Sequence, residues 1–195
     1  MLPAVSVRSD TMGEPGRFRT LDDLIERFAL FPGSPTDGGR VALIVRRGEA
    51  GLREFPESVT VTPEGGIPGD SWGRRAERNP EMQIAVIEAA IADLIANGQP
   101  LGLFGDGLFL DFDLSKENLP ARTIVTIGTA TLEVTPMPHN GCRKFSARFG
   151  PGALRFVSKP ELRHRNLRGI YMRVIAAGDI RVGDKVGVRP GSGPK

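Results

Sequence analysis

The chain has 195 residues, a length that suits one domain with its own core, and its formal net charge of +3 excludes a strongly acidic or strongly basic protein as a whole. Its single cysteine excludes an internal disulfide and fits a reducing compartment. No apolar run is long enough to cross a bilayer, and the N-terminus lacks the charged and apolar regions of a secretory signal. We therefore expect a cytoplasmic protein without a membrane partner.

The N-terminal part of the chain predicts a flexible arm followed by one helix. Residues 1–17 are polar, contain Gly and Pro, and show no periodic pattern. Thr20 is a favourable N-cap residue, and apolar residues at helical spacing follow it from position 21 to position 28. This helix should end before Pro32, because proline disfavours the helical conformation of the residue that precedes it.

The next part of the chain predicts two strands, a glycine-rich loop and a second helix. Residues 41–46 form an apolar run typical of a buried strand, and residues 57–62 alternate apolar and polar side chains. A loop at 65–70 ends in Asp70, where a ligand contact and a simple tight connection are both open interpretations. Asn79 and the proline after it have the form of a helix start, and an apolar stripe continues toward Gly98. The members of this stripe are Ile84, Ile87, Ile91 and Leu94.

The remaining elements are short strands separated by turns. They are predicted at residues 108–114, 123–127, 130–135, 171–175, 180–182 and 185–188. Two helices among about eight strands, with no regular alternation, argue against a doubly wound sheet. We predict a mainly β fold, a closed and largely antiparallel barrel with a few inserted α-helices. It should form a single domain over residues 18–190, with residues 191–195 as a flexible tail.

Positive charge is concentrated in one segment. Residues 139–173 contain nine Lys or Arg and one acid, Glu161, although the rest of the chain has more acids than bases. This asymmetry indicates an anionic partner for the segment. Nucleic acid is disfavoured as the partner, because aromatic residues make up only 6% of the chain and no helix-turn-helix or zinc-finger pattern is present. Phe145, Phe149 and Phe156 are interpreted as core residues.

Cys142 lies in this segment, in a loop that follows the strand ending at residue 135. Gly141 permits a close approach of the backbone to a ligand, and the neighbours His139, Arg143 and Lys144 favour the thiolate form, which binds metals and attacks electrophiles. A buried apolar cysteine is the alternative, but the neighbouring residues are polar. Structural zinc is disfavoured because the chain has only two His and one Cys.

Two further interpretations of the segment stay open. A Cys–His hydrolase with His139 or His164 as base is conceivable, but no nucleophile signature surrounds Cys142. The cluster at residues 163–168 holds three arginines next to Gly169, and guanidinium groups bind phosphate oxygens in pairs. This cluster is either a phosphate clamp or a solvated basic loop.

Several segments in this order resemble the MOSC family, named for the C-terminal domain of molybdenum cofactor sulfurases. They are Ile127-Gly128-Thr129-Ala130-Thr131-Leu132-Glu133-Val134-Thr135, Pro138-His139-Asn140-Gly141-Cys142-Arg143-Lys144-Phe145, Arg148-Phe149-Gly150, Leu167-Arg168-Gly169-Ile170 and Gly178-Asp179-Ile180-Arg181-Val182-Gly183-Asp184. Upstream, residues 66–70 resemble the early glycine-Asp loop of the family. The family's Glu-Asn-Leu motif matches either Glu117-Asn118-Leu119 or a position near Leu108–Leu110, where there is no asparagine. Many members carry a histidine soon after that Asp, whereas Ser71 and Trp72 follow here.

The resemblance implies a closed barrel and a molybdenum-pterin cofactor, with Cys142 as metal ligand or as carrier of a persulfide. The residues expected to bind the cofactor are Asp70, Asn118, His139, Asn140, Gly141, Arg143, Lys144, Arg148, Arg168 and Gly169. Arg143, Lys144 and Arg168 are the candidates for its phosphate. Pyridoxal phosphate is not expected, because a chain of 195 residues has no room for the aminotransferase-like domain of the sulfurases.

Three functions follow as hypotheses. The first is a molybdenum-dependent reductase of N-hydroxylated compounds, which would need an electron-transfer protein. The second is a sulfur carrier that holds a persulfide on Cys142, obtained from a sulfur-donor protein, for delivery to a partner or cofactor. The third and least favoured is a binding module for an anionic ligand or nucleic acid.

Overall fold

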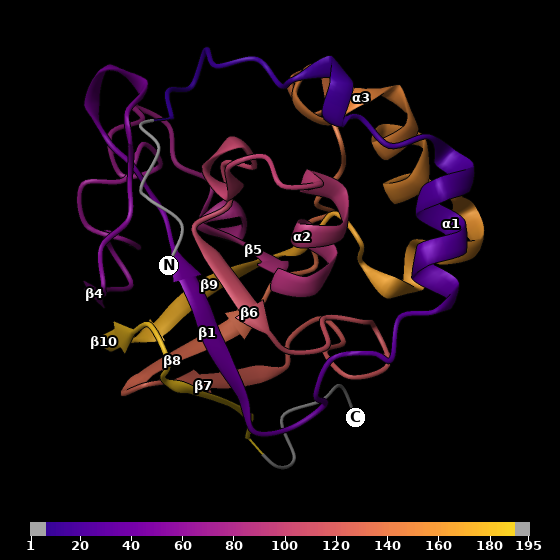
Figure 1. Cartoon of the computed structure of the whole chain (residues 1–195). Helices are drawn as coiled ribbons and strands as arrows, with labels where there is room; N and C mark the ends of the chain where they lie inside the picture. The colour runs from indigo at the N-terminus through magenta and orange to yellow at the C-terminus, as the bar shows by residue number, and fades with distance from the viewer. Residues whose placement is uncertain (1–6, 190–195) are drawn as a thin grey trace.

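The computed structural model describes residues 7–189, and a closed barrel of seven strands forms its centre (Figure 1). The barrel strands are β1 (Gly39–Ile44), β5 (Ile84–Glu88), β6 (Leu108–Asp111), β7 (Ile124–Ile127), β8 (Ala130–Val134), β9 (Ile170–Ala176) and β11 (Lys185–Val188). Around the barrel they follow the order β1-β11-β7-β8-β9-β5-β6. Only β5 and β6 pair in parallel, so the predicted closed and largely antiparallel barrel is confirmed.

Alternate side chains of the barrel strands fill the barrel interior. In the hairpin β7–β8 every second side chain is buried, including Val125, Ile127, Leu132 and Val134, while the residues between them are half-buried. The tight turn at Gly128 joins these two strands as the sequence predicts, with φ of +58° at the glycine. The inward side chains of the other strands join them in one apolar cluster.

Four short strands lie outside the barrel. β4 (Ser58–Val61) pairs with β10 (Gly178–Arg181), and β2 (Arg46–Arg47) pairs with β3 (Arg53–Glu54). The predicted strand at residues 57–62 is therefore confirmed as β4. The single strand expected over residues 41–46 is instead two elements, since β1 ends at Ile44 and Arg46 already belongs to the β2–β3 ribbon.

The prediction of one helix from Asn79 toward Gly98 is wrong in its first half. After a short 3-10 turn, η3 (Pro80–Met82), the chain forms barrel strand β5 and only then α2 (Ala89–Ala96). All five residues of β5 are buried, because Val86 faces the barrel interior and Ile87 faces the helices outside. A strand that is apolar on both faces has no alternation to distinguish it from a buried helix.

Helices cover one side of the barrel. The predicted helix after Thr20 is confirmed as α1 (Leu21–Ala29), and the Thr20 hydroxyl accepts a hydrogen bond from the Asp23 N–H at 3.2 Å. α3 (Arg143–Val157) packs against α1, and the rings of Phe28 and Phe156 meet edge to face with centroids 5.6 Å apart (Figure 1). A second apolar cluster fills the space between the three helices and the barrel.

The sequence pattern does not predict α3, because Gly150 and Pro151 interrupt it. Gly150 has φ of +86° and ψ of 164°, so the helix consists of two pieces joined at a kink. Phe145 and Phe149 lie one turn apart in the first piece and Phe156 lies in the second, and all three are buried. The interpretation of these phenylalanines as core residues is correct.

Of the expected flexible arm, residues 1–6 lie outside the described residues, as does the expected tail at 191–195. From Val7 onward the arm contacts the domain. Val7 is buried, its carbonyl accepts the Arg53 N–H at 2.8 Å, and the Ser9 N–H donates to the Gly51 carbonyl at 2.7 Å. Short 3-10 segments complete the chain, namely η1 (Pro15–Arg17), η2 (Glu49–Gly51), η4 (Leu101–Leu103) and η5 (Pro160–Arg165).

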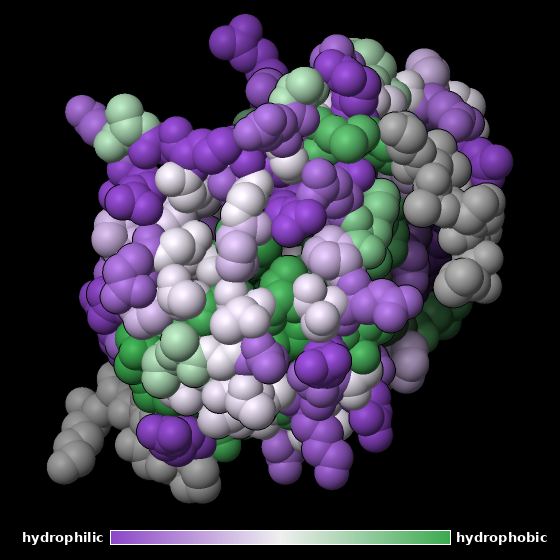
Figure 2. Space-filling view, turned by 90° about the vertical axis from the view of Figure 1, so that its left-hand side faces the viewer, coloured by the Kyte–Doolittle hydropathy of each residue, from purple (hydrophilic) through white to green (hydrophobic). Residues whose placement is uncertain are grey.

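Hydrophilic and intermediate residues cover most of the face that Figure 2 shows. Within residues 7–189, the exposed large apolar side chains are Met12, Leu30, Leu52, Ile175 and Val182. No helix in this part of the chain is long and apolar enough to cross a membrane.

Candidate functional site

A cavity of about 780 Å³ lies where the β2–β3 ribbon, the loop before α3 and the N-terminal arm meet, and we call it the basic cavity. The described residues that line it include seven Lys or Arg and one carboxylate, Glu49. The seven bases are Arg47, Arg53, Arg74, Arg75, Lys144, Arg148 and Arg168. This excess of positive charge in a concave site favours an anionic ligand.

Cys142 lies at this cavity and is exposed. It occupies the N-cap position of α3, after the loop that leaves β8, so its backbone is extended and its side chain is not engaged in capping. Asn140 and Lys144 line the cavity on either side of it in sequence. Arg148, one and a half turns further along α3, is the cation that interacts with Cys142. The thiol is therefore accessible and lies among positive charges.

Asp70, a buried residue outside the cavity lining, fixes the position of Arg47 at the cavity. The Arg47 guanidinium donates to both Asp70 carboxylate oxygens, at 2.5 and 2.9 Å, and the backbone N–H groups of Arg47 and Trp72 donate at 2.9 and 2.8 Å. Burial alone would raise the pKa of Asp70, but these donors outweigh it and hold that pKa below its usual value. Asp70 does not line the cavity itself. Its role is to position Arg47, which does, and to hold the glycine-rich loop in which Asp70 lies.

Asp106 holds Arg168 in the same manner. The Arg168 terminal nitrogen lies 2.8 and 3.1 Å from the two oxygens of Asp106, which is completely buried. Burial raises the pKa of Asp106, and the charge of Arg168 opposes this shift. The His139 ring lies beside the pair, with Nδ1 3.6 Å from Asp106. Burial, followed by the charges of Arg168 and Arg47, keeps the pKa of His139 well below its ordinary value, so this histidine is neutral.

Arg53 and Arg148 lack such carboxylate partners among the described residues. Arg53 donates to the Gly102 carbonyl at 3.2 Å, and Arg148 donates to the carbonyls of Leu103 and Ser9. Both are buried, and burial together with the charges of Arg148 and Arg47 lowers the pKa of Arg53 to about 10. Arg53 is therefore still charged near neutral pH, and neither it nor Arg148 forms an ion pair within residues 7–189.

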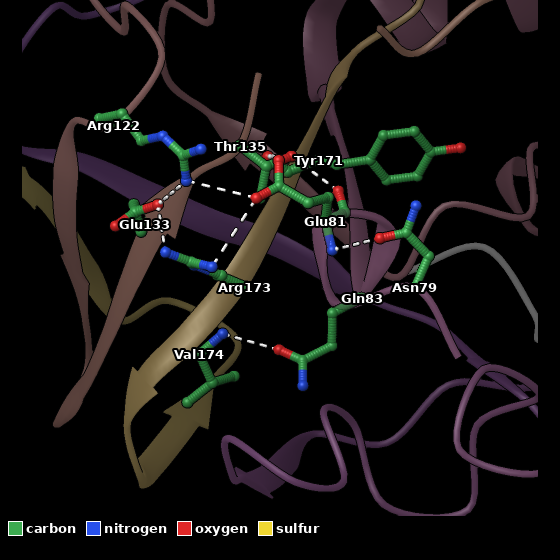
Figure 3. A network of polar contacts seen from close by, with 9 residues as sticks. All are labelled: Asn79, Glu81, Gln83, Arg122, Glu133, Thr135, Tyr171, Arg173 and Val174. Atoms are coloured by element: carbon green, nitrogen blue, oxygen red, sulfur yellow. Dashed lines mark hydrogen bonds and ion pairs between the residues drawn. The ribbon is translucent and has the colours of Figure 1, made fainter. Parts of the chain in front are cut away.

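A polar network anchors the loop that carries Cys142. Figure 3 shows two arginines paired with two glutamates, namely Arg122, Arg173, Glu81 and Glu133. Thr135, where the loop leaves β8, donates its hydroxyl to the Glu81 carbonyl at 2.7 Å and its N–H to the Tyr171 carbonyl at 2.9 Å. The Tyr171 ring points away from the network and packs against the His139 ring, with the centroids 4.3 Å apart and the ring planes tilted by 38°. Both ends of the turn from β8 to His139 are thus fixed.

A second cavity, of about 650 Å³, adjoins the basic cavity. His139, Asn140 and Arg168 line both of them and form the wall between them. Gly141 and Gly169 line the second cavity only. Gly169 has φ of +99°, and a Cβ there would lie 2.1 Å from the Val86 carbonyl oxygen, so only glycine fits.

The structure brings together most of the residues that the sequence singles out. His139, Asn140, Cys142, Lys144, Arg148 and Arg168 line the basic cavity. Arg143 is exposed and lines neither cavity. Asn118 also lies outside both, and its amide donates to the Asp113 carbonyl at 2.8 Å within its own loop.

Sequence reasoning missed the cations that come from the first half of the chain. These are Arg47, Arg53, Arg74 and Arg75. The arginine pairs 46–47 and 74–75 flank the glycine-rich loop and could have served as a signal. Asp106 was missed as well, because it lies in a short loop between Gly105 and Gly107 where no local pattern indicates its burial.

Comparison with known proteins places this architecture in a family. Residues 75–187, more than half of the chain, match the family described as the MOSC domain. A comparison with curated proteins gives no match. The crystal structure of the YuaD protein from Bacillus subtilis is similar, with a TM-score of 0.57 and 14% identity over 77% of this chain and 94% of that one. YiiM from Escherichia coli is similar with a TM-score of 0.51 and 18% identity over 77% of this chain and 69% of that one.

At these identities the two structures support the fold alone, whereas the match over residues 75–187 includes Cys142 and the basic segment. The chain belongs to the MOSC domain family, which is generally associated with binding of the molybdenum cofactor.

Proposed function

We propose that this protein binds the molybdenum-pterin cofactor in the basic cavity, with Cys142 as the protein's metal ligand, and reduces N-hydroxylated compounds. The observation that carries the proposal is the joint presence of an exposed cysteine and seven cations around one cavity. Arg53 and Arg148 support it further, because buried guanidinium groups that form no ion pair within residues 7–189 favour a bound anion.

The residues present fit the cofactor. A Cβ placed on Gly105 would lie 3.5 Å from Arg53 and 3.9 Å from Arg148, so the two guanidinium groups converge on one point, where a phosphate could accept from both. No group of three or more His, Cys, Asp or Glu within residues 7–189 could hold a metal ion by itself. A metal at Cys142 would therefore need further ligands, and the pterin dithiolate brings them. Bound there, the cofactor supplies two-electron redox chemistry.

The chain's own residues set the conditions of the reaction. Reduction of an N-hydroxyl group to N–H takes up two electrons and two protons and releases water, so an electron-donor protein is required. His139 is neutral because its pKa is depressed, so it serves as a hydrogen-bonding wall rather than as a cation. Arg47 and Arg168 are held rigid by buried carboxylates and would orient anionic groups without reorganising.

A sulfur carrier is the second candidate, and the exposure of Cys142 favours it. Delivery of a persulfide sulfur to a partner requires an accessible thiol, and Cys142 is exposed at the mouth of the cavity. The pyridoxal phosphate domain of the sulfurases would in this case be supplied by a separate donor protein.

Metal analysis tests the first candidate. Protein expressed with an intact cofactor pathway and purified without stripping should contain molybdenum, and Cys142→Ser should lower its content by about tenfold or more, because the protein's ligand is lost. Lys185→Gln, which removes an exposed base from β11, should retain it. Absence of molybdenum from the wild type, or equal content in Cys142→Ser, contradicts the proposal. Intact-mass spectra of the same samples distinguish the sulfur carrier, which gains one sulfur atom on Cys142.

A further inference from the structure

The second cavity has the dimensions and lining of a small-molecule site. Its volume of about 650 Å³ lies within the range of roughly 300–1,000 Å³ that is typical of ligand pockets. Much of its wall is apolar and is formed by Leu119, Pro120, Val134, Met137, Val157 and Leu167. It borders the basic cavity across the shared wall of His139, Asn140 and Arg168.

Its polar residues favour an anion. The described lining residues include Lys116, Arg163 and Arg168 but no Asp or Glu. Arg168 is neutralised by Asp106, whereas no ion pair is present for Lys116 or Arg163 in the part of the chain that the structure describes. The net charge facing the cavity is therefore positive, and it comes from two flexible side chains.

Two buried polar atoms of the shared wall have no protein partner. His139 Nδ1 and Arg168 Nε make no hydrogen bond, although the side chains of these residues are only 7% and 9% exposed. Both atoms are inaccessible from the cavity in this structure, so the cations that can reach a ligand there are the exposed Lys116 and Arg163.

We propose that the second cavity binds the organic substrate and selects a small carboxylate with an apolar or aromatic body. The body contacts the apolar wall, Lys116 and Arg163 attract the carboxylate, and the N-hydroxyl group faces the boundary with the cofactor cavity, which His139, Asn140 and Arg168 form. The assignment of the ligand as substrate rests on the function proposed above. The anion site itself depends only on this cavity, so binding can be measured without molybdenum.

Benzoate and benzamide provide a matched pair of probes, because they have the same ring and differ in charge. Titration of the full-length protein by ligand-observed NMR should show benzoate binding several times tighter than benzamide. The double variant Lys116→Gln/Arg163→Gln should weaken benzoate about tenfold, since two weak exposed ion pairs are lost together, and leave benzamide unchanged. The control Lys185→Gln/Arg181→Gln removes two exposed bases elsewhere and should leave both affinities unchanged.

Further variants locate the bound ring. Met137→Trp, at a half-buried lining position, should reduce the binding of both probes by filling the cavity. Lys144→Gln, in the basic cavity only, should not affect benzoate. Equal affinity for the two probes, or a loss of benzoate binding in Lys144→Gln but not in the Lys116/Arg163 variant, overturns the proposal. These outcomes leave molybdenum content unaffected, so failure of this site is distinguishable from failure of the proposed function.

Discussion

At the scale of single residues, two buried carboxylates fix two arginines of the basic cavity, and they differ in how they are stabilised. Asp70 accepts from a guanidinium and from two backbone N–H groups, which lower its pKa. Asp106 depends on Arg168 and is completely buried, so burial prevails and raises its pKa. The contacts of Asp70 therefore favour its ionised form in the folded state.

This difference predicts how acid affects stability. Because the pKa of Asp70 is lowered on folding, its contribution is present above the unfolded value of about 3.9 and is lost as pH falls through the folded value. Asp70→Asn should cost about 3 kcal/mol in urea unfolding at pH 7, and the difference from wild type should shrink below about pH 4. Asp10→Asn, at an exposed ion pair, should change stability by less than about 0.5 kcal/mol. A pH-independent loss in Asp70→Asn would contradict this account.

The candidate site could be predicted from the sequence only where its residues are close together in the chain. Cys142, Lys144, Arg148 and Arg168 all lie in the basic segment, and the contrast in local charge reveals them. The arginines of the β2–β3 ribbon lie near glutamates in the sequence, so the local net charge does not distinguish them from the rest of the chain. They reach the cavity through long-range contacts, such as the Arg47–Asp70 pair, that no local pattern encodes.

At the scale of elements, the sequence pattern does not predict the correct secondary structure where both faces of a segment are buried or where a kink divides it. β5 is apolar on both faces and so resembles the helix that follows it, whereas α1 has one apolar face and a capping Thr20 and is predicted correctly. The kink divides α3 into two pieces, each too short to show a helical period. Hairpin β7–β8 is predicted because its alternation and its turn at Gly128 agree.

The kink in α3 depends on Gly150. Its φ of +86° and ψ of 164° lie in a region open essentially to glycine, and a Cβ there would lie 2.9 Å from the Phe18 side chain. Gly150→Ala should therefore destabilise the protein by about 1–3 kcal/mol in urea unfolding. Gly16→Ala, where a Cβ meets no atom within 4 Å, should be neutral or slightly stabilising. If the two substitutions change the free energy of unfolding equally, then the kink tolerates a side chain at position 150 and does not require glycine.

At the scale of the whole molecule, the last described strand closes the barrel. β11 lies between β1, near the start of the domain, and β7, so closure joins residues far apart in sequence. The fold class follows from the many short strands in the sequence, but the parallel β5–β6 pair and the order of strands do not, because register is set by contacts between distant segments.

Val186 lies at the centre of this closure. It pairs with Gly39 of β1 and with Ile127 of β7, and its side chain is completely buried in the barrel interior. Val186→Asp would place a carboxylate without a partner in that interior and should cost more than about 4 kcal/mol, enough to abolish cooperative unfolding in thermal circular dichroism. Val182→Asp, at a side chain 45% exposed four residues earlier, should change the unfolding temperature little. If Val186→Asp unfolds at the wild-type temperature, β11 is not needed to close the barrel, and the cavities that depend on that barrel would have to be held by the helical layer alone.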